Sequence, residues 1–264
     1  MFATERHQKI RQMALEYKRV DVSRLSRFFS VSEVTIRKDL ERLEKEGFLI
    51  RTHGGAVLNE GSSPVESYTE PINSAEIIRK QAIGSVVSQL IDNGDLIFLG
   101  EGTTCTEIAR HLKVKLDLTV ITNNISAAIE LSANAGIMVI TTGGALKRER
   151  NSFSLEGPSV LEFLSTKYVD KIIISPNGIS FNSGFSMQND LLAQIYRQVL
   201  NKPCQRIICA DSDKFNKNAF LSFGKLTDSD IVVTDEAAPE EYLKFFFEHD
   251  IRVFNAYDIE SMYK

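Results

Sequence analysis

Cysteine, tryptophan, proline and glycine are all scarce in this chain of 264 residues, which has 3 cysteines, no tryptophan, 6 prolines and 15 glycines. Cys105, Cys204 and Cys209 are too few and too scattered for a disulfide framework or a CxxC metal site. The low glycine and proline content excludes a collagen-like or low-complexity chain. No apolar run approaches the roughly 18–20 residues that cross a bilayer, and the charged N-terminal stretch has no signal-peptide core. We therefore expect a soluble, cytoplasmic, globular protein without a metal site or a membrane partner.

The charge is unevenly distributed along the chain. The formal net charge is −4, yet residues 1–58 carry 12 Lys and Arg against 8 Asp and Glu, while the remaining residues carry 19 against 27. A length of 264 residues fits one large domain or two ordinary ones. A basic end on an acidic body favours a nucleic-acid module joined to a separate globular domain.

Apolar residues at helical spacing predict three helices between Glu5 and Leu43. The first has an apolar face made of Ile10, Met13, Ala14 and Tyr17. The second begins at Asp21, a good N-cap residue, and its apolar face consists of Val22, Leu25, Phe28 and Phe29. The third can be capped by Ser32 and ended by Gly47, with an apolar side of Val34, Ile36, Leu40 and Leu43. A short hairpin is then predicted, with strands at Phe48–Ile50 and Ala56–Leu58.

The second and third helices have the spacing of a helix-turn-helix, with Val22–Phe29 as the first helix and Ser32–Lys45 as the second. The N-terminal residues of the second helix would meet base edges, and the basic side chains around it would meet phosphates. The predicted DNA-contacting residues are Arg24, Ser32, Glu33, Thr35, Arg37, Lys38, Arg51 and His53. The alternative is a small helical bundle whose charges face solvent. The positive balance, the three-residue turn and the charged hairpin together favour DNA binding.

The N-terminal sequence resembles the winged helix-turn-helix of the DeoR family of bacterial sugar-operon repressors. The resemblance is carried by Val31-Ser32, by Thr35-Ile36-Arg37-Lys38-Asp39-Leu40, and by His53-Gly54-Gly55-Ala56. Lys38 replaces the family's usual second arginine; it keeps the charge and loses the bidentate geometry. The resemblance implies an operator-binding winged helix-turn-helix over residues 1–58.

The rest of the chain predicts a linker followed by an α/β domain. Residues 59–74 lack apolar periodicity and contain two prolines, which is typical of a linker. From 75 to 264, helices and short apolar strands alternate, which predicts a mostly parallel sheet covered on both faces. The predicted strands are Leu96–Leu99, Leu118–Ile121, Ile137–Ile140, Lys171–Ser175, Arg206–Ala210, Ile231–Val233 and Arg252–Phe254. The predicted helices are Ala75–Ile91, Thr103–Leu112, Asn124–Ala133, Asp190–Leu200 and Pro239–His249.

Several predicted strands end in polar loops of similar chemistry. In open α/β sheets, ligands bind beyond the carboxyl ends of the strands, where glycine allows close approach and helix N-termini expose N–H groups. Threonine, asparagine and lysine at such ends suit a phosphorylated, hydroxyl-rich small molecule. The predicted effector-binding residues are Gly102, Thr103, Thr104, Asn123, Asn124, Gly143, Gly144, Lys147, Asn177, Asp211 and Lys214. Neither GxGxxG nor GxxxxGK[ST] occurs, so we expect no dinucleotide or other cofactor.

The resemblance to the DeoR family continues through these loops. It is carried by Gly102-Thr103-Thr104, Thr122-Asn123-Asn124, Gly143 to Lys147, Gly157-Pro158 and Asp211 to Phe215. It implies a sensor domain related in fold to ribose-5-phosphate isomerase, whose loops form a sugar-phosphate cradle. Two departures stand out, since Gly100 replaces the family's Asp and Ser175 to Gly178 replaces Gly-x-x-Gly. Similar variants occur among the family's lactose-type repressors.

Two other functional classes remain open from sequence. A sugar-phosphate isomerase with an appended DNA module needs a base beside the reacting carbons, for which Glu101, Asp211, Asp213 and Lys214 are candidates. A carboxylate is missing at Gly100, however, and a shared fold does not transmit function. A protein-interaction adaptor would leave the polar loops unexplained. We therefore expect a non-enzymatic transcriptional regulator, most simply a repressor of carbohydrate catabolism, that acts as a homodimer or homotetramer on operator DNA with a phosphorylated sugar as effector.

Overall fold

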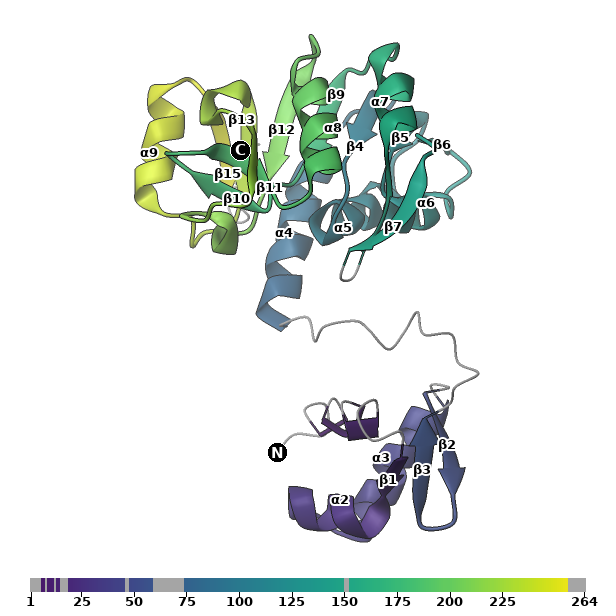
Figure 1. Ribbon diagram of the computed structural model, residues 1–264. Coiled ribbons are helices and arrows are strands. Elements are labelled where there is room, and N and C mark those ends of the chain that lie inside the picture. The colour runs from purple at the N-terminus through teal and green to yellow at the C-terminus, as the bar shows by residue number, and fades with distance from the viewer. Residues whose placement is uncertain are drawn as a thin grey trace. The chain divides into compact units, whose positions relative to one another are not determined.

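The computed structural model of the chain describes residues 6–7, 9–11, 13–14, 19–45, 48–58, 74–149 and 152–255 (Figure 1). Contacts divide the chain into an N-terminal unit, Met1–Pro71, and a C-terminal unit, Ile72–Lys264. The linker predicted over 59–74 lies outside the described residues except for Ser74, with which a helix begins.

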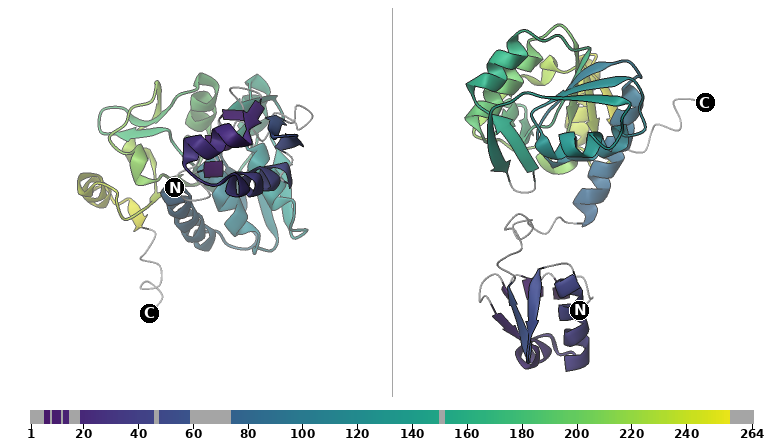
Figure 2. Two further views of the ribbon diagram at one scale, coloured as in Figure 1. Left: turned by 90° about the horizontal axis from the view of Figure 1, so that it is seen from below. Right: turned by 90° about the vertical axis from the view of Figure 1, so that its right-hand side faces the viewer.

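The N-terminal unit packs helices against a small antiparallel sheet (Figure 2, right). Helical backbone is described at 6–7, 9–11 and 13–14. Five elements follow in chain order: β1 (Arg19–Asp21), α2 (Val22–Phe29), α3 (Glu33–Lys45), β2 (Leu49–Thr52) and β3 (Gly55–Leu58). The strand order is β1-β3-β2. The helices and the hairpin bury one apolar core that includes Ile10, Leu25, Ile36, Leu40 and Leu49. Such a core allows the unit to form its own compact body.

The predicted helix-turn-helix is confirmed, with three corrections. Strand β1 was not predicted, because three residues of mixed polarity carry no periodicity. Asp21 stands at the N-cap of α2 but makes no side-chain cap hydrogen bond. Phe28 and Val34, both predicted to face the core, are 62% exposed, whereas Phe29 and Asp39 are buried. The predictions for Tyr17 and Gly47 lie outside the described residues.

The C-terminal unit is built on a seven-stranded parallel sheet with strand order β15-β14-β12-β9-β4-β5-β6. Its strands are β4 (Leu96–Leu99), β5 (Leu118–Thr122), β6 (Ile137–Thr141), β9 (Lys171–Ile174), β12 (Gln205–Cys209), β14 (Ile231–Thr234) and β15 (Arg252–Asn255). Alternate side chains of each strand enter different cores. In β4, Ile97 and Leu99 join one apolar cluster while Phe98 joins the other. Burial on both faces explains why these strands read as continuous apolar runs.

Helices cover both faces of this sheet. One face packs against α4 (Ser74–Leu90), α5 (Thr103–Leu112) and α6 (Ile125–Leu131). The other packs against α7 (Pro158–Ser165), α8 (Asp190–Leu200) and α9 (Glu240–Glu248). The predicted mostly parallel α/β fold is therefore confirmed. Among the described residues, none of the helices has the length and hydropathy of a membrane span.

Sequence reasoning missed the smaller elements of the C-terminal unit. These are helix α7, the hairpin of β7 (Ala145–Glu149) and β8 (Ser152–Glu156), and a second sheet of β10 (Gly178–Ser180), β11 (Gly184–Met187) and β13 (Leu221–Gly224). Their strands are short and rich in serine and glycine, so they lack a clear apolar alternation. They form because their apolar side chains, such as Phe185 and Met187, complete one of the two cores.

Candidate DNA interface and effector site

The N-terminus of α3 presents a polar, mostly exposed surface. The Thr35 amide donates to Ser32 Oγ at 3.2 Å, and the two hydroxyl oxygens lie 2.9 Å apart, so Ser32 caps the helix as predicted. Ser32, Glu33, Arg37 and Lys38 are exposed, and Thr35 is half-buried. A capped recognition helix holds these side chains in one orientation, as contact with base edges requires.

Arg37 is paired with a carboxylate one turn earlier. Its Nη2 lies 3.0 Å from Glu33 Oε2, and the two side chains are 56% and 47% exposed. An exposed i,i+4 pair of this kind contributes only about 0.3–0.5 kcal/mol. Arg37 can therefore leave Glu33 and bind a guanine edge or a phosphate at a small cost in free energy. In the absence of DNA, Glu33 holds the Arg37 side chain in position.

Val34 is a candidate interface residue that sequence reasoning missed. It lies in the first turn of α3 and its side chain is 62% exposed. An exposed valine here can contact a thymine methyl group in the major groove. The available signal was positional, because Ile36, Leu40 and Leu43 already form the buried side and leave Val34 on another face.

The predicted wing and backbone contacts are exposed basic side chains around α3. Arg51 lies on β2 and His53 in the turn between β2 and β3, and both are exposed. The Arg51 amide donates to Glu44 Oε1 at 3.1 Å, which ties the wing to α3. Arg24 is exposed on α2. The positive side chains of Arg24 and Arg51, with the imidazole N–H of His53, suit phosphate contacts that fix the register of the helix.

A buried ion pair fixes α3 from behind. Arg6 Nε lies 2.5 Å from Asp39 Oδ2, and His7 Nε2 lies 2.7 Å from Asp39 Oδ1. Arg6 and Asp39 are each 6% exposed. Burial alone would raise the pKa of the Asp39 carboxyl, but the hydrogen bonds from Arg6 and His7 outweigh it and hold the pKa below its ordinary value. The N-terminal helical segment and α3 are thereby joined by charge.

The predicted effector loops follow five consecutive strands of the large sheet, β12, β9, β4, β5 and β6. Because these strands are parallel, their carboxyl ends share one edge, which we call the carboxyl edge. The topology therefore brings together loops that lie far apart in the sequence, such as those of Gly102 and Asp211, which are 109 positions apart. This edge is where ligands bind in open α/β sheets.

The loop after β4 opens α5. Gly102 stands at the N-cap with φ of +100°, a conformation that L residues rarely adopt, and Thr103 and Thr104 form the first turn. The backbone N–H groups of such a turn bind anions. Lys80 of α4, only 6% exposed, donates to Thr103 Oγ1 at 2.7 Å and pairs with Glu76. A buried ammonium group beside a helix N-terminus adds a full positive charge to this anion site.

Lys80 was missed by sequence reasoning, although a signal was present. It lies three and seven positions before the buried residues Ile83 and Val87, so it shares the buried face of α4. A lysine on a buried face is uncommon without a charged partner. Its position on that face was the available indication of a functional or paired charge.

Gly100 is explained by the structure. A Cβ atom at this position would lie 2.6 Å from Tyr196 Oη and 3.0 Å from Ile174. The buried Tyr196 hydroxyl accepts from the Glu101 amide at 3.0 Å. The phenol of α8 therefore occupies the space that a side chain at position 100 would need, and the loop after β4 is held by Tyr196.

Asn123 and Asn124, after β5, are both fully buried. Asn124 Oδ1 caps α6 by accepting from the Ala127 amide at 3.0 Å, and its Nδ2 donates to the Gly102 carbonyl at 3.1 Å. Asn124 thereby ties the loop after β5 to the loop after β4. Asn123 Nδ2 donates to the Leu155 carbonyl at 3.4 Å, while its buried Oδ1 has no hydrogen-bond partner among the described residues.

Four other predicted residues border the carboxyl edge less closely. Gly143 and Gly144 follow β6 and are exposed. Lys147 lies on β7 with its Nζ 3.8 Å from Oε2 of the buried Glu156. Asn177 follows β9 and is exposed, and its Oδ1 accepts from the Gln188 amide at 2.9 Å.

The loop after β12 supplies a buried carboxylate and a cation. Asp211 is 1% exposed; its Oδ1 accepts from the Asp213 amide at 3.2 Å, and its Oδ2 has no hydrogen-bond partner among the described residues. Lys214 is half-buried in the same turn. Its charge is felt by Glu76 of α4, whose pKa is held below its ordinary value first by the hydrogen bond from Lys80 and further by Lys214 and Arg79. Lys80 and Lys214 thus flank one carboxylate.

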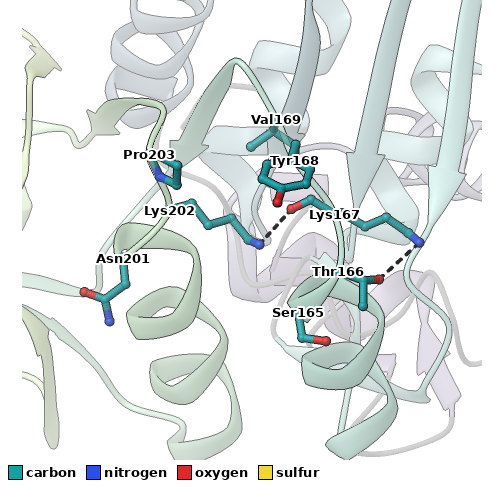
Figure 3. A pocket seen from close by; sticks show the side chains of 8 residues that line it. All are labelled: Ser165, Thr166, Lys167, Tyr168, Val169, Asn201, Lys202 and Pro203. Carbon is teal, nitrogen blue, oxygen red and sulfur yellow. Dashed lines mark hydrogen bonds between the residues drawn. The ribbon is translucent and has the colours of Figure 1, made fainter.

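A surface hollow of about 220 Å³ lies at the opposite, amino-terminal edge of the sheet (Figure 3). It is lined by Ser165, Thr166, Lys167, Tyr168, Val169, Asn201, Lys202 and Pro203. Lys202 Nζ donates to the Lys167 carbonyl at 2.8 Å. Both lysines follow the C-termini of helices, α7 and α8, where cations complement the helix dipole. The hollow shares no residue with the carboxyl edge.

Nowhere in the described ranges do three or more metal-ligating side chains gather into a possible metal site.

A helix-turn-helix with a basic wing, followed by a separate α/β unit with a polar carboxyl edge, defines a two-domain DNA-binding regulator. Two family models match the chain. The DeoR-like helix-turn-helix domain matches residues 6–62, and the DeoR C terminal sensor domain matches residues 75–236. The chain belongs to the DeoR family of transcriptional regulators.

Curated relatives match almost the full length. An uncharacterized HTH-type transcriptional regulator, YulB, from Bacillus subtilis is 36% identical over 96% of each chain. The HTH-type transcriptional repressor GlcR from the same organism is 33% identical over 89% of each. A putative aga operon transcriptional repressor from Escherichia coli O157:H7 is 31% identical over 91% of this chain and 89% of its own. These relatives are regulators and repressors, and this chain is likewise a regulator rather than an enzyme.

Solved structures match more distantly. A D-ribose-5-phosphate isomerase in complex with phospho-erythronic acid has a TM-score of 0.39 at 13% identity, covering 55% of each chain. The eIF2B delta subunit from Chaetomium thermophilum has a TM-score of 0.40 at 16% identity, covering 55% of this chain and 51% of its own.

Proposed function

We propose that this protein represses a carbohydrate-catabolism operon and leaves its operator when a phosphorylated sugar intermediate binds the carboxyl edge. The observation that carries the proposal is the buried Lys80 ammonium beside the N-terminus of α5. Together they favour a dianionic phosphate at Gly102, Thr103 and Thr104.

The remaining polar groups of the edge support a hydroxylated ligand. The buried acceptors Asp211 Oδ2 and Asn123 Oδ1 have no hydrogen-bond partner among the described residues, and a buried acceptor without a donor is costly. Sugar hydroxyl groups would supply such donors. Lys214 adds a second cation near the phosphate position. The relatives GlcR and the aga operon repressor are named as transcriptional repressors, which agrees with repression of an operon.

On DNA, Arg37 and Val34 would meet base edges, while Arg24, Lys38, Arg51 and His53 would meet phosphates. Winged helices that bind paired half-sites act as symmetric oligomers, so the operator complex would be a homodimer or homotetramer. The effector weakens DNA binding only if it prefers one arrangement of the chain over the other. A coupling of about 1–3 kcal/mol lowers operator affinity roughly 5–150-fold.

The test is operator binding with and without a panel of sugar phosphates. Fragments upstream of the protein's own and neighbouring genes are first selected with the protein, and the tightest fragment is titrated in the presence of each compound. The matched controls are the unphosphorylated sugars and inorganic phosphate. We expect one sugar phosphate to release the protein while its unphosphorylated form does not. If no compound in the panel changes operator affinity, the proposed effector class is wrong.

Paired variants separate the two activities. Arg37→Ala should strongly weaken operator binding and leave sugar-phosphate affinity intact. Lys214→Ala should bind operator normally, Lys80→Met should still bind operator, and both should require much more effector for release. Operator affinity unchanged in Arg37→Ala would contradict the assignment of the recognition helix, and normal release of Lys80→Met would contradict the phosphate position.

A further inference from the structure

The two ends of α4 are attached to the C-terminal unit in different ways. The later turns pack through buried Ile83, Val86 and Val87. The early turns expose Ile77 by 37% and Ile78 by 60%, and they project beyond the sheet and helices of their unit (Figures 1 and 2). α4 is also the element that follows residues 59–73 in the sequence, and thus follows the N-terminal unit.

Charged side chains fasten the early turns of α4 to the carboxyl edge. The Arg79 guanidinium pairs through Nη2 with Asp213, and its Nε lies 3.7 Å from Asp235 Oδ2. Asp213 lies in the turn after β12, and Asp235 directly follows β14. Arg79 therefore bridges the ends of two neighbouring strands from a third element.

The two carboxylates that Arg79 bridges differ in freedom. Asp235 is 2% exposed and accepts from the amides of Ser212 at 2.7 Å and Ala237 at 3.0 Å. The Asp213 side chain is 60% exposed, so it is the partner that can turn away. Because a guanidinium group has several donors in a fixed fork, it can hold both carboxylates or transfer to another anion nearby.

Lys80, the next residue, also connects α4 to the carboxyl edge. It pairs with Glu76 in the same helix and donates to Thr103 at the start of α5. Arg79 and Lys80 thus connect the early turns of α4 to three loops of the carboxyl edge, those that follow β4, β12 and β14. A dianion beside Thr103 and Lys214 would compete with Glu76 and Asp213 for these cations.

We propose that Arg79 is a positioning residue that couples effector occupancy to DNA binding through the early turns of α4. The inference rests on the proposed function for the position of the anion. With the edge empty, Arg79 holds α4 against Asp213 and Asp235, and this latched helix favours operator binding. An anionic effector draws Arg79 and Lys80 away from their carboxylates, and the early turns of α4 are released.

The test compares variants of the full-length protein in the absence of any effector. Arg79→Gln and Asp213→Asn should each lower operator affinity at least about 5-fold, the lower bound of a usual coupling. The double variant should bind operator DNA no more weakly than whichever single variant binds it more weakly, because both changes break the same ion pair. Hydrogen exchange at the amides of 75–80 should be faster in each variant than in wild type. Asp213 is largely exposed, so Asp213→Asn tests the pair in a variant expected to fold normally.

Arg110→Gln is the matched control. Arg110 also bridges two carboxylates of the C-terminal unit, Glu107 at 2.6 Å and Glu130 at 3.0 Å, away from the carboxyl edge. It should change operator affinity by less than 2-fold and leave exchange at 75–80 unchanged. Unchanged or increased operator affinity in Arg79→Gln, additive effects in the double variant, or an equal loss in Arg110→Gln would each overturn the proposal.

A negative result in this experiment can be told apart from a failure of the proposed function. It uses wild type and variants on DNA without sugar phosphates, so a panel in which no compound releases the protein leaves its result valid. If Arg79→Gln weakens DNA binding while no sugar phosphate acts, the coupling stands and the effector class is wrong. If a sugar phosphate releases wild type while Arg79→Gln binds DNA as wild type does, the effector class stands and the coupling is overturned.

Discussion

Single charged residues decide how the recognition helix is held. Asp39 lies in the middle of α3, faces inward, and accepts from both Arg6 and His7. A carboxylate buried beside a positively charged partner stabilises the fold only while the carboxylate is ionised. Its effect on base contacts is indirect, because it fixes the face that α3 presents. Arg37, on that outer face, is held only by an exposed carboxylate.

We expect the stability of the N-terminal unit to fall in acid because of Asp39. Its folded pKa lies below the ordinary value, so the stabilisation is fully present above the unfolded pKa and is lost as pH falls through the folded pKa. Loss should therefore begin from about pH 4 downward. Asp39→Asn should remove this part of the pH dependence and, at neutral pH, cost about 3–5 kcal/mol because Arg6 is left buried without a charge partner.

Thermal unfolding of the full-length protein between pH 3 and 7 measures this effect in the transition of the N-terminal unit. Asp21→Asn is the control, because Asp21 is a partly exposed carboxylate of the same unit that makes no cap hydrogen bond. A pH profile for Asp39→Asn identical to that of wild type would contradict the role assigned to the ion pair.

Whole elements are joined at the carboxyl edge by side chains that the sequence shows only as polar loop residues. Asn124 caps α6 and donates to Gly102 at the start of α5. Tyr196 of α8 holds the loop after β4 through the Glu101 amide. The two contacts fix the relative positions of helices on opposite faces of the sheet. The proposed anion site at α5 would therefore be preorganised by its neighbours.

Asn124→Ala should destabilise the C-terminal unit even without a ligand. It removes a helix cap, which typically contributes about 0.5–2 kcal/mol, and it removes one of two side-chain donors to the Gly102 carbonyl, the other being Thr106 Oγ1. Thermal unfolding without and with the releasing sugar phosphate separates this structural role from ligand contact. Asn177→Ala is the comparison, since Asn177 is exposed at the same edge. Wild-type stability of Asn124→Ala would show that its buried hydrogen bonds contribute little.

On the scale of the whole molecule, basic residues are concentrated at one end. Residues 1–58 carry a surplus of positive charge while the remainder carries a larger surplus of negative charge. Phosphate contacts by the basic end release counterions, so affinity falls with salt in proportion to the number of contacts. An acidic remainder would repel the DNA phosphates, which favours contact through the basic winged helix.

We expect log operator affinity to fall linearly with log salt concentration, and Arg51→Gln to reduce the slope by about 1. Arg51 lies on the wing, where a phosphate contact is proposed, so its loss should weaken binding to all sequences alike. Lys244→Gln, at an exposed pair on α9, should leave the slope unchanged. Titrations at four or more salt concentrations measure both slopes. Equal slopes for wild type and Arg51→Gln would place the wing away from the backbone.

The sequence predicted well what depends on local periodicity. Val22–Phe29, Thr103–Leu112 and Asp190–Leu200 were predicted with the bounds that α2, α5 and α8 have. It failed where a residue's environment is set by a distant segment. Val34 and Phe28, predicted on the apolar faces of their helices, are exposed in the fold, and strand β1 forms because β3 pairs with it.

The sequence by itself determined the two-part organisation, the helix-turn-helix and the polar chemistry of the strand ends, because periodicity and motif spacing are local properties. Only the tertiary structure decided which groups meet at those ends. Lys80 and Arg79 lie 23 and 134 positions from Thr103 and Asp213, their respective partners, and the exclusion of a side chain at Gly100 depends on Tyr196, 96 positions away. Such pairings follow from the order of strands in the sheet and from burial, and no local pattern encodes them.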